Sequence, residues 1–572
     1  MITGKSALAR SAQVGDKTQI FEPDLVLING QIKTPSGWQE AVAISDGVIV
    51  SVGDTHTVSA MVSGESEVID LKGSTVLPGM HDMHVHPLFA GMEQSSCGLE
   101  PGASPLSIAK ALRTCVADKK PGEWIVGGNW VAAVFKPGEQ TREFLDKVVP
   151  NNPVLLNDEA HHSVWVNSMA LERAGITSAT PDPEGGIIER NAAGEPNGLL
   201  RERAVGIVAN ILPPASEKEK REALILSTNI MLSHGITSFM VASVRDTNMG
   251  VLSALSEEGL IKQRVRGCLV WSHAPDDLNS ISEALIRARE FYARPRFATD
   301  CIKIFLDGVP TESHTAAMLA PYADTQTMGK DERPERGLLF IPQPVLDAAV
   351  ARFDGQGLHI KFHVAGDASV QSAINAVGVA RKTNGLGGPV HHVGHSNFVS
   401  QADIPRVGEL QMAWEFSPYI WYPTPITDHD VRRAVGEERM KRFTPIKEAL
   451  DTGALVTVGS DWSVVPSVNP WLAIETMVTR QKPGGSSSTV GVQERVSLDD
   501  AIKIMTENGA RLMGHRDKVG AIEVGMRADI IVTETNPYEV PVEQVHTTRV
   551  KMTFIDGEKV FDSALTSKAG AN

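Results

Sequence analysis

The stretch 77-LPGMHDMHVHP-87 places three histidines and an aspartate within six positions, directly after the apolar run 74–77. Side chains two residues apart on a strand point to the same face, so Asp82, His84 and His86 are expected to project together where a strand ends. Two imidazoles that converge from one strand make a pair of metal ligands. An H-x-H motif also occurs by chance in surface turns, so its meaning depends on the rest of the chain.

Short apolar runs recur along the body of the chain, and helix-like stretches follow most of them. The helix-like stretches have recognisable starts, such as the capping box of Ser216 and Glu219 and the Asn469-Pro470 pair. Strands that alternate with helices are typical of a parallel barrel, so the expected fold class is α/β, a (β/α)8 TIM barrel. The eight runs are TVLPGMHDMHVH, GITSFMVAS, RVRGCLVW, CIKIFLDG, LHIKFHVAGD, PVHHVGHS, MAWEFSPYI and LVTVGSDW.

Both ends of the chain carry short β-type runs separated by turn signals, such as Asn29-Gly30 and Asp556-Gly557. These runs predict a small β-sandwich domain that is built from both termini. Residues about 90–215 separate the first two barrel strands, which is too long for a loop and predicts a large inserted subdomain. The predicted limits are 1–75 and 516–572 for the two parts of the β-sandwich domain and 76–515 for the barrel.

The composition is that of an ordinary globular protein, with 54 Lys and Arg against 69 Asp and Glu and a net charge of −15. This acidic balance argues against nucleic-acid partners and against an anionic membrane surface. No apolar run has the length of a signal peptide or a membrane span, so a cytoplasmic location is expected. The cysteines show no CxxC pairing and are expected to be free thiols of a reducing compartment: Cys97, Cys115, Cys268 and Cys301.

Metal-competent side chains recur where the predicted barrel strands end. Lys303 shares its strand face with Cys301 and Phe305, and a lysine that faces a barrel interior is costly unless it is paired or chemically changed. Each candidate alone has an ordinary structural explanation, such as a helix cap for Asp461. Six candidates at equivalent positions instead indicate an active site at the carboxyl-terminal rim. The six are His84, His86, Lys303, His363, His395 and Asp461.

From DLVLINGQI to FIDGEKVF, the chain resembles the amidohydrolase superfamily, and within it the YtcJ-like branch (amidohydrolase family 3), which includes N-substituted formamide deformylases. The resemblance covers nearly the whole chain and is specific for the family rather than for a substrate. It rests on the motifs LPGMHDMHVHP, HHSVWVNSMAL, TPDPEGGII, IKIFLDGVPTESHTAAML, HVAGDASV, VGSDWSVVPSVNPWLAI and VGAIEVGMRADIIV.

The resemblance implies a binuclear zinc centre bridged by Lys303 after carbon dioxide has converted it to a carbamate. One metal would be bound by His84, His86 and Asp461, and the other by His363 and His395. The implied reaction is hydrolysis of an amide, formamide or cyclic amide by metal-activated hydroxide, with Asp461 as general base and then general acid. His162 would steady the oxyanion. Contacts to a small apolar or aromatic substrate are expected from His161, His314, Trp165, Trp421 and Trp462.

Three alternatives stay open: a mononuclear deaminase, a metal-dependent decarboxylase or isomerase, and a metal-binding regulatory protein without catalysis. A mononuclear site needs no bridging lysine, so Lys303 disfavours it. The expected partner is a small-molecule substrate, and self-association as a dimer is compatible with the resemblance. The sequence departs from the family pattern in three places. It has Gly394 for glutamate, His314 for arginine, and His161 where glycine precedes the family histidine.

Overall fold

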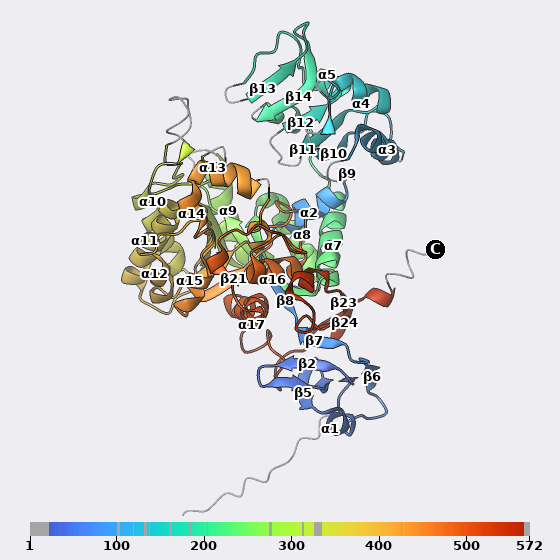
Figure 1. Ribbon diagram of the computed structural model, residues 1–572, viewed down its shortest axis with the longest axis vertical. Helices are drawn as coiled ribbons and strands as arrows, with labels where there is room; N and C mark the ends of the chain where they lie inside the picture. The colour runs from blue at the N-terminus through green and yellow to red at the C-terminus, as the bar shows by residue number, and fades with distance from the viewer. Residues whose placement is uncertain are drawn as a thin grey trace, which may run out of the picture.

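The computed structural model describes residues 22–565, except 100–102, 118, 131–133, 137, 159–162, 184–185, 203, 274–276, 312–313, 325–334 and 425. Figure 1 shows three parts arranged along the longest axis of the molecule. A barrel lies in the middle, a β domain that contains strands from both chain ends lies at one end, and an inserted α/β region lies at the other. His161 and His162 lie outside the described residues.

Eight parallel strands form the barrel, in the order β21-β20-β19-β18-β17-β16-β15-β8. The first strand meets the segment after the last one, where the His86 N–H donates to Trp462 O (2.7 Å) and the Asp461 N–H donates to His84 O (2.7 Å). The predicted TIM barrel is therefore confirmed. Its strands are β8 (Met80–Val85), β15 (Ile236–Val244), β16 (Arg264–Val270), β17 (Phe297–Phe305), β18 (His359–Val364), β19 (His392–His395), β20 (Ala413–Phe416) and β21 (Leu455–Val458).

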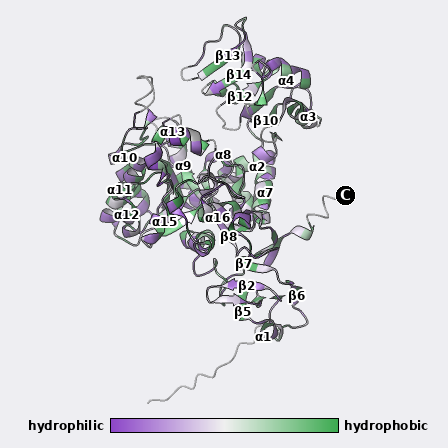
Figure 2. Cartoon of the chain, in the orientation of Figure 1, coloured by the Kyte–Doolittle hydropathy of each residue, from purple (hydrophilic) through white to green (hydrophobic). Residues whose placement is uncertain are grey.

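Helices cover the outside of the barrel and carry a mixture of hydrophilic and hydrophobic residues (Figure 2). The capping box of Ser216 and Glu219 is present at the start of α7, and Asn469 caps α16 as predicted. The helices of this part are α2 (Pro87–Gln94), α7 (Glu217–Ser233), α8 (Asp246–Glu257), α9 (Asp277–Tyr292), α10 (Gln343–Gly355), α11 (Asp367–Asn384), α12 (Ile404–Glu409), α13 (Arg432–Val435), α14 (Glu437–Met440), α15 (Ile446–Asp451), α16 (Pro470–Thr479), α17 (Leu498–Lys503) and α18 (Gly509–Leu512).

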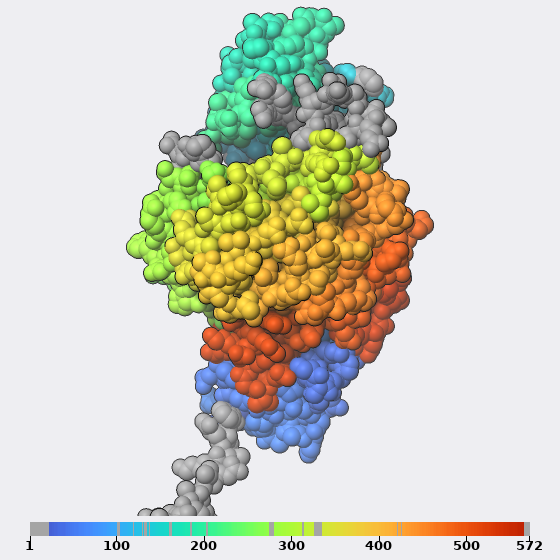
Figure 3. Space-filling view, turned by 90° about the vertical axis from the view of Figure 1, so that its left-hand side faces the viewer, coloured from blue at the N-terminus to red at the C-terminus, as the bar shows by residue number. Residues whose placement is uncertain are grey.

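The β domain combines a four-stranded sheet, β5-β4-β1-β6, with a six-stranded sheet, β24-β23-β22-β7-β2-β3. In the larger sheet Val76 pairs with Val532, so strands from the N-terminal and C-terminal parts of the chain share one sheet, and the two parts lie side by side (Figure 3). The predicted sandwich from both termini is confirmed. The strands are β1 (Leu25–Ile28), β2 (Gln31–Thr34), β3 (Gly37–Gln39), β4 (Ala41–Ser45), β5 (Val48–Gly53), β6 (Glu67–Asp70), β7 (Thr75–Pro78), β22 (Ile530–Thr533), β23 (Val550–Ile555) and β24 (Glu558–Asp562), with helix α1 (Thr55–Ser59).

The insertion between β8 and β15 has its own six-stranded sheet, in the order β13-β14-β12-β11-β10-β9, and its own buried core around Leu156 and Trp165. The large insertion after the first barrel strand is thus confirmed, while the residue limits predicted for the domains stay predictions. Its elements are β9 (Cys97–Gly98), α3 (Pro105–Val116), β10 (Ile125–Trp130), α4 (Arg142–Val148), β11 (Val154–Asp158), β12 (Ser163–Val166), α5 (Ser168–Arg173), β13 (Gly186–Arg190), β14 (Pro196–Glu202) and α6 (Val205–Ala209).

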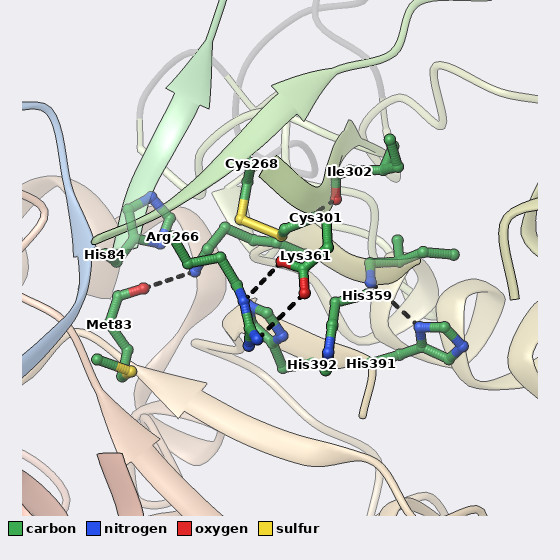
Figure 4. Close-up of a disulfide and its surroundings, with 12 residues drawn as sticks. Met83, His84, Arg266, Cys268, Cys301, Ile302, His359, Lys361, His391 and His392 are labelled. Atoms are coloured by element: carbon green, nitrogen blue, oxygen red, sulfur yellow. Dashed lines mark hydrogen bonds and ion pairs between the residues drawn. A yellow bond between two sulfur atoms is a disulfide. The ribbon is translucent and has the colours of Figure 1, made fainter. Parts of the chain in front are cut away.

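The cysteines are paired in disulfides, so the expectation of free thiols was wrong. Cys97 pairs with Cys115 inside the insertion, and Cys268 pairs with Cys301 between the adjacent barrel strands β16 and β17 (Figure 4). Partners 18 and 33 residues apart are brought together only by the topology, which motif spacing does not reveal. The cysteines therefore give no support to a reducing compartment. Among the described residues, none of the helices combines the length and apolar character needed to cross a bilayer.

Candidate metal centre

The six predicted ligands all lie at the carboxyl-terminal ends of barrel strands. This placement follows from the parallel sheet, because strands of one direction bring their last residues to one rim. His84 lies in β8 and His86 just after it, Lys303 lies in β17, His363 in β18, His395 ends β19, and Asp461 lies three residues after β21.

Three of these side chains form a compact cluster that fits a metal ion. Ligand atoms of His84, His395 and Asp461 all lie within 4.8 Å of one another, and the three residues are buried. His84 Nε2 lies 3.5 Å and His86 Nε2 lies 3.2 Å from Asp461 Oδ1. Two nitrogen donors and a carboxylate that converge in a buried place form a donor set that suits zinc.

His363 and Lys303 extend the cluster toward the neighbouring strands. The ring centroid of His363 lies 4.5 Å from that of His395, and His363 Nε2 lies 3.2 Å from Gly308 O. Lys303 is fully buried, and its Nζ lies 4.8 Å from the ring centroid of Phe305. Its charge acts on His84, His363 and Asp461, which places the ammonium among the other candidates.

The backbone around Asp461 holds this residue in an unusual conformation. Asp461 and His395 have φ angles of +62° and +69°, in the left-handed region that costs non-glycine residues roughly 1–3 kcal/mol. Gly459 lets β21 approach β8 closely, because a Cβ at this position would lie 2.2 Å from His84 Cβ. Asp82 of β8 also holds this segment in place, because its carboxylate accepts hydrogen bonds from the N–H and hydroxyl groups of Ser460, the residue before Asp461.

Burial and neighbouring charges set the protonation states of the cluster. Burial lowers the pKa of His84 and His395 well below the usual value, so both rings are neutral and each has a nitrogen lone pair to offer. Burial alone would raise the pKa of Asp461, but the hydrogen bond with His86 and the nearby positive charges lower it overall. Burial, followed by the charge of Lys361, lowers the pKa of Lys303 to about 7.

Two further buried residues, Lys361 and Glu415, adjoin the cluster and were missed in the sequence. Glu415 Oε1 lies 2.5 Å from His84 Nδ1, while Oε2 forms an ion pair with Lys361 Nζ. Lys361 also donates to Met83 O at 2.8 Å (Figure 4). The available signal was a lysine two positions before His363, on the same strand face as this candidate ligand.

The tryptophans predicted to contact substrate are buried in hydrophobic cores. Trp165 packs against Phe135 and Phe144 in the core of the insertion and donates from Nε1 to Thr141 O, which accounts for it without a substrate. Buried Trp421 and Trp462 belong to the large core cluster of the barrel.

His314 is buried after β17, stacked on Tyr322 with a centroid distance of 4.2 Å. Its Nε2 lies 3.0 Å from Asp324 Oδ1. His395, which follows Gly394, has Ser417 Oγ at 3.4 Å and Asp461 Oδ2 at 3.9 Å from its Nδ1.

Comparison with known proteins agrees with this architecture. A sequence model of the amidohydrolase family matches residues 67–561. The putative amidohydrolase YtcJ of Bacillus subtilis (strain 168) is 27% identical over 534 residues, which cover 92% of this chain and 96% of that protein. The N-substituted formamide deformylase of Arthrobacter pascens is 25% identical over 552 residues, which cover 93% and 97%. An uncharacterized metal-dependent hydrolase from Pyrococcus furiosus shares the fold, with a TM-score of 0.71, 24% identity, and coverage of 90% and 100%.

Proposed function

The chain belongs to the amidohydrolase family, and from this premise we propose that it is a metal-dependent hydrolase of carbon–nitrogen bonds in small amides, formamides or cyclic amides. The observation that carries the proposal is the buried convergence of His84, His395 and Asp461. The proposed centre holds two zinc ions. His84, His86 and Asp461 would bind one ion, His363 and His395 would bind the other, and Lys303 would bridge them as a carbamate.

Zinc bound in this centre would supply hydroxide from water at neutral pH and polarise the carbonyl of the substrate. Asp461 is the proposed proton carrier, because its lowered pKa keeps the carboxylate ionised and able to accept the proton of the attacking water. When the carbon–nitrogen bond breaks, Asp461 returns this proton to the leaving nitrogen. The hydrogen bond between Asp461 N–H and His84 O holds the carboxylate beside the ligands during both transfers.

Lys303 suits carbamate formation better than its buried neighbour Lys361. Carbon dioxide reacts with a neutral amine, forming a nitrogen–carbon bond while a proton leaves. Burial lowers the pKa of Lys303 to about 7, so a large neutral fraction exists at physiological pH. Lys361 forms an ion pair with Glu415, which favours its charged form, whereas the ion pairs among the described residues leave Lys303 out.

The surroundings of the cluster favour a substrate with an apolar substituent. Phe89 is 57% exposed, and its ring centroid lies 6.5 Å from that of His86. Val464, three residues after Asp461, is 72% exposed, and Val309 is exposed beside Gly308, whose carbonyl contacts His363. Exposed apolar side chains this close to polar ligands suit an alkyl or aryl group on the scissile amide. The deformylase relative acts, by its name, on N-substituted formamides.

The deciding experiment measures metal per chain by elemental analysis in the wild type, in Lys303→Ala and in the surface control Lys441→Ala, followed by hydrolysis of N-alkyl and N-aryl formamides. We expect about two zinc ions per chain in the wild type and the control, and a sharp loss of both metal and hydrolysis in Lys303→Ala. One metal per chain that is unchanged by Lys303→Ala would overturn the bridged centre. Full metal content without hydrolysis of the N-alkyl or N-aryl formamides would contradict the proposed reaction.

A further inference from the structure

We infer that Glu415 is a positioning residue that orients His84 toward the metal centre. Lys361 balances the charge of the buried Glu415 carboxylate, and Gly394 leaves the space that this carboxylate occupies. The inference rests on the proposed metal centre. It starts from the two nitrogens of His84, which have different neighbours. Nε2 faces Asp461 at 3.5 Å, whereas Nδ1 faces Glu415 Oε1 at 2.5 Å. A carboxylate on Nδ1 fixes the proton there and leaves the Nε2 lone pair for a metal.

Glu415 reaches His84 from a strand that is not a neighbour of β8. It lies in β20, which β21 separates from β8 in the barrel sheet. The Glu415 side chain is fully buried, and its partners are the side chains of His84, Lys361 and His392, the last at 3.2 Å. The orientation of His84 therefore depends on a contact across the barrel interior, in addition to its own strand.

Lys361 supplies the charge that makes a carboxylate tolerable at this depth. An unpaired buried carboxylate would take up a proton or destabilise the fold, since removing its charge from water is strongly unfavourable. The Lys361 ammonium contacts Glu415 Oε2. It also donates to the carbonyl of Met83, the residue that precedes His84 (Figure 4). One lysine thus holds both the carboxylate and the strand that carries the histidine.

Gly394 leaves the space that the carboxylate occupies. It pairs with Glu415 in the register of β19 and β20. A Cβ at position 394 would lie 2.8 Å from Phe362 O, 3.2 Å from Glu415 Oε1 and 3.7 Å from His84 Nδ1. A side chain here would clash with the Phe362 carbonyl and crowd the Glu415 carboxylate where it meets His84. Glycine at 394 and glutamate at 415 therefore act together.

A simple structural role for Glu415, as the counter-ion of Lys361, predicts a different outcome from a positioning role. The chain offers a matched control, because Asp354 also bridges a buried cation and a histidine, with Arg381 at 2.5 Å and His391 at 2.8 Å. Asp354 lies near the carboxyl-terminal end of α10, and its side-chain partners Arg381, Asn384 and His391 are not candidate ligands. Removing either bridge costs stability, but only Glu415 should affect metal binding.

The test compares Glu415→Leu/Lys361→Met with Asp354→Leu/Arg381→Met, in which leucine offers no acceptor to the histidine. Each pair of substitutions removes both charges, so neither leaves a buried ion unpaired. The measured quantities are the Zn²⁺ dissociation constant from chelator competition, the visible absorption spectrum of the Co²⁺-substituted protein, and the melting temperature without metal. We expect the Glu415 variant to bind zinc about 10–100-fold more weakly with an altered cobalt spectrum. We expect the Asp354 variant to have a lower melting temperature but the wild-type zinc affinity and cobalt spectrum.

A third variant, Glu415→Asp, keeps a buried negative charge to balance Lys361 but shortens the side chain by one methylene, so the carboxylate no longer reaches His84 at hydrogen-bond distance. It should retain most of the wild-type melting temperature while losing zinc affinity. Wild-type affinity and spectrum in both Glu415 variants would overturn the positioning role and leave the proposed function intact. An equal loss of zinc affinity in the Asp354 variant would also overturn it. A wild-type protein that binds no stoichiometric metal would overturn both this inference and the proposed function.

Discussion

At the scale of single residues, the candidate centre depends on side chains held away from their ordinary preferences. Asp461 and His395 keep left-handed backbone conformations, and Lys303 lies fully buried with a pKa lowered by burial to about 7. Such costs persist only where the surrounding structure fixes the residue, and they gather at functional sites. For Asp461 the surrounding structure is the hydrogen-bonded contact between the end of β8 and the segment after β21.

His81 offers a prediction about pH at this scale. Burial lowers its pKa from 6.5 to about 3, so the folded state binds fewer protons than the unfolded state between these values. The stability that comes from neutral His81 is therefore complete above pH 6.5 and is lost as the pH falls toward 3. Between pH 7.5 and pH 5 this loss amounts to about 2 kcal/mol.

Replacing His81 by glutamine removes the titration, so we expect the melting temperature of the metal-free variant to fall less than that of the wild type between pH 7.5 and pH 5. Metal-free protein is required because His84 and the other candidate ligands would otherwise exchange metal for protons. If the melting temperatures of the wild type and the variant fall equally between pH 7.5 and pH 5, the protonation of His81 does not differ between the folded and unfolded states, and the prediction is wrong.

At the scale of the elements, the meeting of β8 and β21 is the point where the barrel closes and where the ligands from both strands come together. Gly459 is placed at this contact, with no room for a Cβ beside His84. We expect Gly459→Ala to lower stability by about 1–3 kcal/mol through overpacking and to reduce the bound metal. Melting temperature and elemental analysis measure the two effects.

The control for Gly459 is Gly250→Ala, in the middle of α8, where a Cβ would have nothing within 4 Å. Alanine there should stabilise the helix by roughly 0.5–1 kcal/mol and leave the metal content unchanged. If Gly459→Ala also keeps its metal content and does not lower the melting temperature, β21 can move away from β8 without disturbing the candidate ligands.

The sequence predicted elements better than contacts between them. Apolar runs at regular spacing identified all eight barrel strands. The period of two does not describe β8, where the pairing with β15 shifts register and Met83 packs in one cluster with Cys268 and Cys301. Lys361 and Glu415 were not predicted as site residues, because a charged residue in a short strand usually marks an exposed face. Only the folded barrel shows that these two side chains meet. Trp165 was placed near substrate for the opposite reason, since aromatic residues of a core and of a pocket look alike in sequence.

At the scale of the whole molecule, the two disulfides lie in different parts, one in the insertion and one in the barrel. Protein unfolded without reductant should therefore show none of its four thiols to a thiol reagent, and all four after reduction. We expect Cys97→Ser/Cys115→Ser to destabilise the insertion by about 3 kcal/mol, for a bridge of 18 residues, without loss of metal. Limited proteolysis and elemental analysis separate these effects.

The matched substitution Cys268→Ser/Cys301→Ser lies in the barrel, two residues from Lys303, and should instead lower the melting temperature of the metal-binding part. Free thiols in the unreduced protein would contradict the pairing. Loss of metal from the insertion variant would show that the insertion takes part in the centre.

The sheet shared by both chain ends has a consequence for synthesis on the ribosome. Strand β7 emerges early, but its partner β22 follows some 450 residues later, and β23 and β24 come last. During most of translation β7 therefore has an open edge where β22 will bind, beside apolar Val76 and Leu77. The nascent chain must keep this edge from pairing elsewhere until β22 arrives, so any delay in translation between β7 and β22 prolongs the exposure of the edge and should favour aggregation.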